Sequence, residues 1–225
     1  MTSAWKWTIF FSIIAASLWF LSEALPRGDR RHRSVDLSDL RASSAEPSPM
    51  QAPANLATAT LAAGCFWCVE AVLERIVGVH RVESGYTGGD SVDPSYREIS
   101  GGRTGHAECV QIEFDPALLS YEKLLTVFWE LHDPTTRDRQ GADRGSQYRS
   151  AIFYHDDEQR MTAERSLAEK EASGDLRDAI VTEIAPATTF YAAEENHQDY
   201  FSTNPSAGYC RMVISPKLKK LGLLQ

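Results

Sequence analysis

The sequence has 225 residues, of which 43% are hydrophobic and 24% are charged, and its formal net charge is −8. These proportions are typical of a globular protein with a core of its own, and the length allows one sizeable domain with additional segments. The negative charge argues against nucleic acid as a partner, because binding to phosphates requires a basic surface.

The N-terminal segment differs from the rest of the chain. Residues 7–22 carry no charge and follow Lys6, which is the pattern of a signal peptide or a short membrane anchor. The run is shorter than the ~20 residues that a transmembrane helix needs. Ser22-Glu23-Ala24 is an acceptable cleavage site, whereas the arginines between residues 27 and 33 would hold the downstream chain in the cytoplasm if the segment spans a membrane. We therefore predict a signal peptide or membrane anchor at residues 1–24, and an exported or membrane-anchored protein whose side of the membrane stays open.

A linker is expected to separate this segment from the domain. Residues 34–56 are rich in Ser, Ala and Pro and contain almost no large apolar side chains. Such a composition is typical of a flexible chain, because it offers too little apolar surface to form a core. We predict a flexible linker at residues 25–56 and a catalytic domain at residues 57–225.

The spacing of apolar residues in the domain predicts alternating strands and helices. The first six expected elements are a strand at 57–63, a helix at 68–77, strands at 79–86 and 108–114, a helix at 121–132 and a strand at 150–154. The order β-α-β-β-α-β is that of a ferredoxin-like α/β sandwich, so we expect an α+β fold with a mixed sheet and long loops. A charged helix at 156–172, a strand at 180–185, a short helix at 193–201 and an irregular C-terminal tail complete the expected domain.

Cys65 lies between the first expected strand and the first expected helix, in Gly64-Cys65-Phe66-Trp67-Cys68. The backbone N–H groups at a helix N-terminus are unpaired and the helix dipole is positive there, so a thiolate is favoured. A cysteine whose pKa is lowered in this way is a nucleophile at neutral pH. The two aromatic residues that follow suit an apolar pocket beside the sulfur. The alternative is a buried structural cysteine among core aromatics.

The other cysteines leave several interpretations open. Cys65 and Cys68 form a C-x-x-C, which is a redox pair, half of a zinc site or a coincidence. Zinc would need a second close pair of ligands, which the sequence lacks, so we expect no metal. Cys109 alternates with apolar residues in a strand and is expected to pack. Cys210 follows a stretch with Pro and Gly that reads as a movable loop, so its thiol either closes over the Cys65 site or is a chance cysteine.

Two polar loops carry further candidates. Glu108 follows the glycine-rich stretch 101–107 at the start of a strand, where a carboxyl beside aromatic residues would have a raised pKa and hold a proton near neutrality. A solvated loop carboxylate is the alternative. Asp143 and Tyr148 lie in a connection that is long for a simple link, and long loops are often functional.

Six segments together resemble one known family, the type A peptide methionine sulfoxide reductases. They occur in order from Gly64 to about Lys219, and they read GCFWCVE, PSYREIS, GHAEC, HDPTT, GSQYRSAIF and EENHQDYF. The resemblance implies an α/β sandwich that reduces the S epimer of methionine sulfoxide, free or in proteins, without metal or organic cofactor. It also implies regeneration by thioredoxin or a similar dithiol, and we expect a monomer. The implied roles are Cys65 as nucleophile, Glu108 as acid, Tyr96 and Tyr148 as binders of the sulfoxide oxygen, Phe66 and Trp67 as the cage for the substrate methyl group, and Asp143 as a polar residue lining the site.

This chemistry agrees with the residues themselves. A sulfoxide oxygen leaves only after protonation, so the site needs a thiolate on the sulfur and a proton donor at the oxygen. Attack by Cys65 gives a sulfenic acid, and a second thiol condenses with it to a disulfide. Many family members carry glycine where this chain has Cys68, which puts the identity of the second thiol in doubt. We expect Cys210, because a loop moves freely, and keep Cys68 in the first helical turn as the alternative.

A different activity also fits part of the sequence. A thiol–disulfide oxidoreductase would use Cys65-x-x-Cys68 after a strand, but would not explain Glu108, Tyr96 and Tyr148. A non-enzymatic domain held together by disulfides would be denser in cysteine than this chain.

Overall fold

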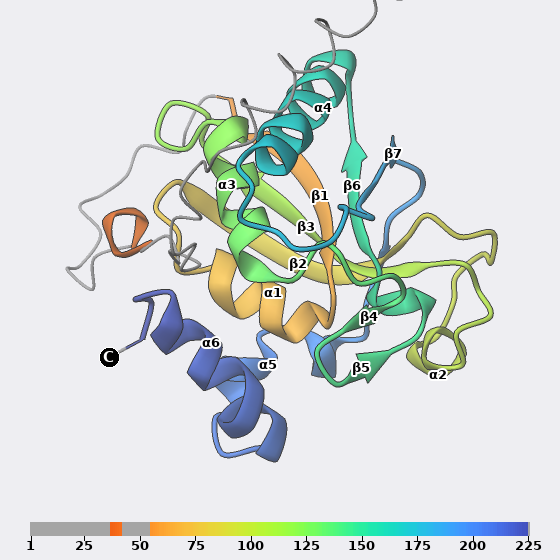
Figure 1. Ribbon diagram of the computed structural model, residues 1–225. Helices are drawn as coiled ribbons and strands as arrows, with labels where there is room; N and C mark the ends of the chain where they lie inside the picture. Colours follow the sequence, from red (N-terminus) through yellow and green to blue (C-terminus); the bar gives the residue numbers. More distant parts are fainter. Residues whose placement is uncertain (1–36, 42–54, 225) are drawn as a thin grey trace, which may run out of the picture. The chain divides into compact units, whose positions relative to one another are not determined.

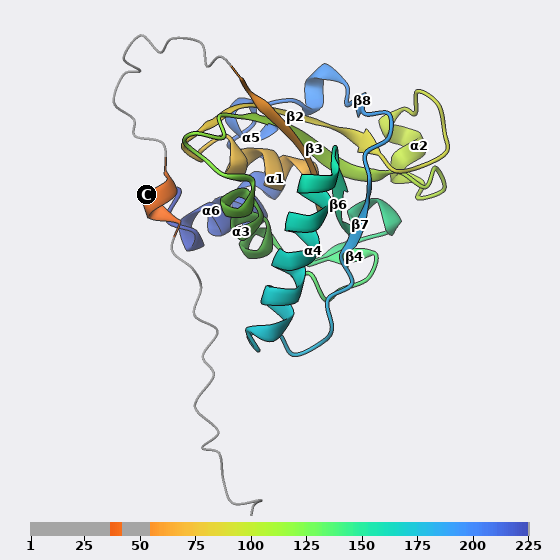
Figure 2. The same ribbon diagram turned by 90° about the horizontal axis from the view of Figure 1, so that it is seen from above.

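The computed structural model describes residues 37–41 and 55–224. Its main sheet has six strands in the order β7-β6-β1-β3-β2-β8 (Figures 1 and 2). All neighbouring pairs are antiparallel except β6 and β7, which are parallel, so the sheet is mixed. The strands are β1 (Ala57–Ala63), β2 (Val79–Thr87), β3 (Ala107–Phe114), β6 (Ser150–Tyr154), β7 (Glu183–Pro186) and β8 (Tyr191–Ala192). The ferredoxin-like order predicted from the sequence is confirmed.

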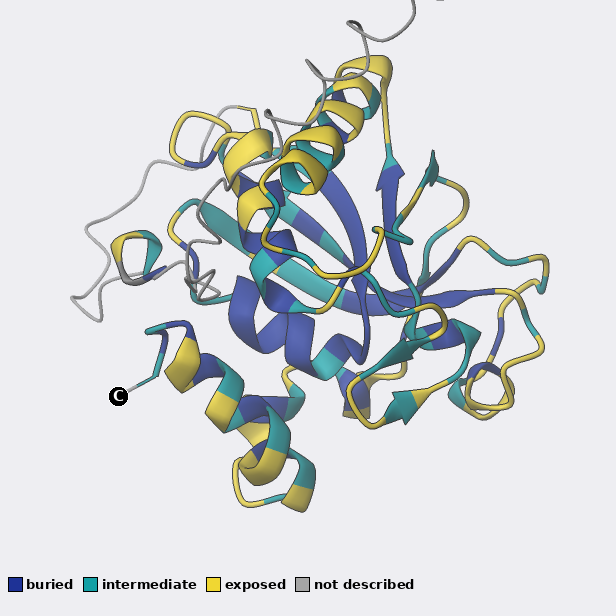
Figure 3. Ribbon diagram, in the orientation of Figure 1, coloured by how far each residue is buried: buried dark blue, intermediate teal, exposed yellow. Residues whose placement is uncertain are grey.

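Helices α1 (Phe66–Leu73), α3 (Tyr121–Leu131) and α4 (Asp157–Ala172) pack on one face of this sheet. Side chains alternate along a strand, so Leu61 faces the helices and Ala62 faces the other side. The helical face carries most of the core, which Figure 3 shows in dark blue across the central strands and α1. The other face is lined by small residues under Phe153, with Phe190 packed against them.

Local signals account for where several helices begin and end. Ser120 caps α3, as predicted, because its hydroxyl oxygen accepts a hydrogen bond from the Lys123 N–H at 3.3 Å. Asp156 caps α4 by accepting from Gln159 N–H at 2.8 Å. Gly174 follows α4 with a φ of +71°, a conformation that favours glycine.

Three predicted elements differ from the structure. Helix α1 begins at Phe66 and ends at Leu73, whereas a helix over 68–77 was expected. The connection between β2 and β3, in which no element was expected, contains the short helix α2 (Tyr96–Ser100), whose N-terminus is capped by Ser95 and Glu98 in a capping box. Residues 193–201, expected as one helix, form a 3₁₀ turn (Glu195–His197) and then α5 (Tyr200–Thr203).

The C-terminal tail is helical, so the prediction of an irregular tail was wrong. A π-helical segment (Cys210–Ile214) continues into α6 (Ser215–Lys220), and the π segment contacts α1 (Figure 1). Cys210, Ile214 and Leu218 recur every four residues and are completely buried, which stabilises a helix even after a stretch with Gly and Pro. This helical spacing is visible in the sequence, but the Pro and Gly residues that precede it led to the prediction of an irregular tail.

Part of the predicted linker contacts the domain. Leu37 is buried in the core, and the Leu40 carbonyl accepts a hydrogen bond from Val77 N–H at 2.8 Å. An apolar side chain in a polar stretch is enough to attach the chain at residues 37–41. Residues 1–36 and 42–54, including the predicted signal peptide or anchor, lie outside the described residues. Within the described part of the chain, no helix has the length and apolar character needed to cross a membrane.

Candidate active site

Cys65 is the residue at which β1 passes into α1. Gly64 has a φ of +91°, and a Cβ on it would lie 2.7 Å from the Cβ of Gln140, so only glycine fits this turn. Cys65 is the N-cap of α1 with an extended ψ of 121°, and its side chain is 8% exposed. Cys68 lies three residues later and donates its backbone N–H to the Cys65 carbonyl at 3.0 Å. The two thiols therefore lie in the first helical turn, as predicted.

The electrostatics of this pair differ from the sequence-based expectation. Burial raises the pKa of Cys65 well above its usual value, with further increases from the Cys68 thiol and the Glu108 carboxylate. The hydrogen bond from Cys65 lowers the pKa of Cys68 to about 7, against the opposing effect of burial. The helix N-terminus alone thus does not make Cys65 the thiolate, because desolvation outweighs it.

Glu108 approaches the same turn from β3. Its side chain is 1% exposed, and one carboxyl oxygen accepts a hydrogen bond from Phe66 N–H at 3.2 Å. Burial raises the pKa of this carboxyl to about 8, and the Phe66 hydrogen bond opposes that rise. The group is therefore a neutral acid at pH 7 rather than a solvated carboxylate, and it can donate a proton beside Cys65.

Two tyrosines belong to the same cluster. Tyr96 begins α2 and donates its backbone N–H to Glu194 at 2.9 Å. Tyr148 ends a 3₁₀ turn (Ser146–Tyr148). Burial raises the pKa of both hydroxyls, and nearby charges on Glu108 and Cys65 raise it further. Both hydroxyls therefore stay protonated and lie within electrostatic range of the thiol and the acid.

Tyr209 links Cys68 to Asp143, and the sequence analysis did not identify it. Asp143 lies on β5 (Asp143–Arg144), which pairs with β4 (Arg139–Gln140) in a small hairpin. The Tyr209 hydroxyl donates to the Asp143 carboxylate at 2.7 Å and accepts from the Cys68 thiol at 3.6 Å. Its place directly before Cys210 was the available signal.

Aromatic rings surround the turn. Trp67 stacks flat on Tyr200, with ring centroids 3.7 Å apart and planes at 9°, and His197 lies 5.5 Å from it. Phe66 is buried 5.7 Å from His197 and 6.4 Å from Tyr96. His197 and Tyr200 both belong to the segment EENHQDYF, for which the sequence analysis named no residue roles.

Cys210 is buried, not mobile. It lies in the π-helical segment with 0% of its side chain exposed, so the premise of a freely moving tail was wrong. Burial raises the pKa of its thiol, and the proximity of Cys68 raises it further. The structure thus brings Cys210 next to Cys68. All four cysteines are free thiols, and Cys109 is buried in the sheet, where it donates to the Gly85 carbonyl at 3.5 Å.

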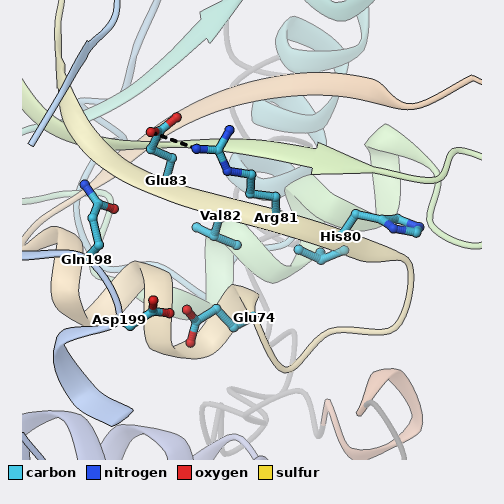
Figure 4. A pocket seen from close by; sticks show the side chains of 8 residues that line it. Glu74, His80, Arg81, Val82, Glu83, Gln198 and Asp199 are labelled. Carbon is cyan, nitrogen blue, oxygen red and sulfur yellow. Dashed lines mark hydrogen bonds and ion pairs between the residues drawn. The ribbon is translucent and has the colours of Figure 1, made fainter. Parts of the chain in front are cut away.

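A separate pocket of about 330 Å³ lies between β2, the end of α1 and the start of α5 (Figure 4). Its lining includes Glu74, Arg81, Gln198 and Asp199, and none of the residues predicted for the active site. Among residues 37–41 and 55–224, no group of three or more His, Cys, Asp or Glu side chains is arranged to hold a metal ion.

Comparisons with known proteins agree on one family. The model of the family described as peptide methionine sulfoxide reductase matches residues 57–223. The chain is 56% identical to the peptide methionine sulfoxide reductase MsrA of Natronomonas pharaonis over 163 residues, which cover 72% of this chain and 92% of that one. It is 52% identical to the enzyme of that name from Deinococcus radiodurans, over 72% of this chain and 79% of that one.

Solved structures give the same answer. Reduced Mxr1 from Saccharomyces cerevisiae is similar with a TM-score of 0.65 and 33% identity, over 72% of this chain and 92% of that one. Methionine sulfoxide reductase A of Corynebacterium diphtheriae has a TM-score of 0.61 and 32% identity, over 78% of this chain and 92% of that one.

Proposed function

The chain belongs to the peptide methionine sulfoxide reductase family and is a thiol-dependent reductase of methionine sulfoxide, and we propose that Cys65 is its nucleophile and Glu108 its acid. One observation carries the assignment. A buried carboxyl with a pKa of about 8 accepts a hydrogen bond from the N–H of Phe66, the residue that directly follows the Cys65 thiol at the start of α1. A sulfoxide needs this combination of groups, a nucleophile at sulfur and a proton at oxygen.

The first step transfers the oxygen. Cys65, after passing its proton to Cys68, attacks the sulfoxide sulfur while Glu108 protonates the oxygen. A bond forms between the Cys65 sulfur and the substrate sulfur while the S–O bond breaks and the oxygen leaves as water. Water then attacks the Cys65 sulfur and the bond between the two sulfurs breaks, so that thiol and sulfoxide become sulfenic acid and sulfide. The hydroxyls of Tyr96 and Tyr148 bind the oxygen, Phe66 and Trp67 hold the methyl group, and Asp143 orients Tyr209 beside the sulfurs.

The second step forms a disulfide and releases water. We infer that Cys68 attacks the Cys65 sulfenic acid first and that Cys210 then takes over the bond to Cys68. Two features support this order. Cys65 is the non-helical N-cap, so the pair lies at the start of the helix, where a disulfide is least strained. Cys210 is buried beside Cys68, whereas the earlier expectation assumed a mobile loop. A thioredoxin or similar dithiol then reduces the disulfide by exchange.

The assignment can be tested with methyl p-tolyl sulfoxide and dithiothreitol. The wild type should reduce the S enantiomer and leave the R enantiomer, because one enzyme type acts on each epimer. Cys65→Ser should lose the activity, and Cys109→Ser serves as the matched control, since the Cys109 side chain lies on the face of the sheet opposite to Glu108. More than a tenth of wild-type activity in Cys65→Ser would contradict the assignment. Disulfide exchange on a model disulfide, without sulfoxide reduction, would favour a thiol–disulfide oxidoreductase instead.

We propose further that residues 7–22 export or anchor the domain. The support is the uncharged run after Lys6. Cell fractionation with protease protection tests this: recovery of the whole chain in the cytosolic fraction would contradict it.

A further inference from the structure

Residues 194–200, here called the strap, run from β8 to α5 and lie along β2. Glu194 accepts hydrogen bonds from the Tyr86 hydroxyl at 3.1 Å and from Tyr96 N–H at 2.9 Å. Gln198 pairs with the backbone of Ser84 on both sides, accepting from its N–H at 2.9 Å and donating to its carbonyl at 2.8 Å. Hydrogen bonds therefore hold the beginning and the middle of the strap to β2 and α2. The last residues of the strap are held by a different element.

Glu70 holds the end of the strap. It lies within α1, is 1% exposed and takes no part in the reaction. One carboxyl oxygen accepts from the Ser84 hydroxyl at 3.0 Å, and the other accepts from Tyr200 N–H at 3.3 Å. Tyr200 is the first residue of α5, whose N–H groups have no partner within that helix. Glu70 therefore caps α5 from a neighbouring element.

The turn that Glu70 holds contains a residue in a strained conformation. Asp199 has a φ of +51°, a conformation that costs energy for a residue other than glycine and persists only when its surroundings impose it. Behind Asp199 and Gln198 lies the 330 Å³ pocket, in which the carboxylates of Asp199 and Glu74 point toward one another (Figure 4). The Asp199 carbonyl accepts a hydrogen bond from Thr203 N–H at 3.0 Å within α5, whereas the bond from Tyr200 N–H to Glu70 ties the turn to α1.

The Tyr200 ring connects this turn to the active site. Tyr200 lies flat on Trp67 at 3.7 Å, and Trp67 stands between Phe66 and Cys68 in the chain. We propose that Glu70 is a positioning residue for sulfoxide reduction: by holding Tyr200 N–H it keeps the Tyr200 ring against Trp67 and fixes the indole as a wall of the methyl cage. This inference rests on the proposed function, in which Trp67 contacts the substrate methyl group.

A positioning role predicts which half of the reaction changes. A displaced indole weakens the apolar contact with the substrate, and such contacts contribute roughly tenfold or more to discrimination and binding. Regeneration by dithiol takes place at the sulfurs and does not use the cage. A change at Glu70 should therefore affect the oxygen-transfer step and leave the regeneration step unchanged.

The test measures the two half-reactions of the full-length protein separately. Glu70→Ala should raise the half-saturating sulfoxide concentration in single turnovers about tenfold and leave the second-order rate of dithiol regeneration unchanged. Glu70→Gln should restore most of the loss, because its amide can still accept from Tyr200 N–H and bond to Ser84. Glu83→Ala is the matched control, since Glu83 precedes Ser84 but pairs with Arg81 at 2.9 Å.

A double-mutant cycle identifies the route. Tyr200→Ala should raise the half-saturating concentration as well, and Glu70→Ala should add little to it, because residues that act through one contact are not additive. Equal losses in both half-reactions, full additivity, or a Glu70→Gln variant as impaired as Glu70→Ala would overturn the proposal. A wild type that reduces no sulfoxide would instead refute the proposed function and is recognised before any variant is made.

Discussion

Two regions of the molecule meet at the first turn of α1, and they contribute differently. The ferredoxin-like unit supplies the groups proposed to act in oxygen transfer, Cys65 and Cys68 at the first turn of α1 and Glu108 from β3. The C-terminal region, residues 194–220, supplies what surrounds them, namely the stacked rings of His197 and Tyr200, the half-buried Tyr209 and the buried Cys210. The reacting atoms are held by the sheet, and their environment is held by a segment packed onto it.

The difference separates two kinds of sensitivity. Changes in the ferredoxin-like unit should alter the bond-making step itself, because they remove a nucleophile or a proton. Changes in the C-terminal region should alter binding, the ionisation of the thiols or the transfer of oxidation, while the first chemical step continues. Each of the following experiments tests this division.

The largest effect is expected at Glu108. Glu108→Gln removes the proton donor and should slow sulfenic acid formation by about 10²–10⁴-fold. In the wild type the rate should rise as the cysteine pair ionises near pH 7 and fall as Glu108 loses its proton near pH 8, because its raised pKa keeps it acidic only below that value. Stopped-flow single turnovers across pH measure this, and Glu108→Gln should lose the alkaline fall. Glu113→Gln, on the outside of the same strand, is the control; an unaltered pH profile in Glu108→Gln would make Glu108 structural.

Variants of Cys68 and Cys210 test the difference between the two regions most directly. After one turnover without reductant, Cys68→Ser should keep a sulfenic acid on Cys65, which dimedone traps. Cys210→Ser should stop at the Cys65–Cys68 disulfide and keep its dithiothreitol activity. It should lose most of its thioredoxin-driven turnover, because in the proposed order thioredoxin attacks the Cys68–Cys210 disulfide, which this variant cannot form. Mass spectrometry of the thiol-blocked, oxidised protein identifies each species.

A disulfide between other cysteines would change the roles assigned to the two regions. A direct Cys65–Cys210 disulfide in the wild type, with none between Cys65 and Cys68, would show that the C-terminal region takes part in the second bond-making step. It would require the π-helical segment to move, because Cys210 is fully buried in the reduced protein.

The smallest effect is expected at Tyr209. Tyr209→Phe removes the hydroxyl between Cys68 and Asp143, and that hydroxyl helps to lower the pKa of Cys68. The midpoint of thiol alkylation against pH should move upward, and the first turnover near neutrality should slow by about two- to tenfold, the value of one hydrogen bond. Tyr154→Phe, on β6, is the control. A lost first turnover would place Tyr209 among the reacting groups.

The sequence predicted the ferredoxin-like unit well and the C-terminal region poorly. The strands at 57–63 and 150–154 and the Ser120 cap depend on local apolar alternation and on a local hydrogen bond, so they are visible in short windows. Cys65 was identified because the strand-to-helix change is itself local.

The strap and the tail depend on distant partners. Residues 194–200 take their shape from hydrogen bonds to Ser84, Tyr86 and Glu70, and the shortest of these links spans 108 residues of the chain. The pKa of Cys65 was misjudged for the same reason, since burial by other elements outweighs the local helix terminus. Tyr209 gave no periodic signal, and only the fold brings it to Asp143.

The buried proton on Glu108 has a consequence for the folded state as a whole. Its carboxyl holds a proton up to a pH of about 8 when folded, whereas the unfolded chain releases that proton at the ordinary acidic pKa of a glutamate. Between those two values the native protein binds more protons than the unfolded one, so its free energy of unfolding falls as the pH rises, by at most about 1.4 kcal/mol for each pH unit. Above pH 8 the cost is complete. The contribution of this carboxyl, which is proposed to protonate the leaving oxygen, should therefore lower the melting temperature from mildly acidic to basic buffers.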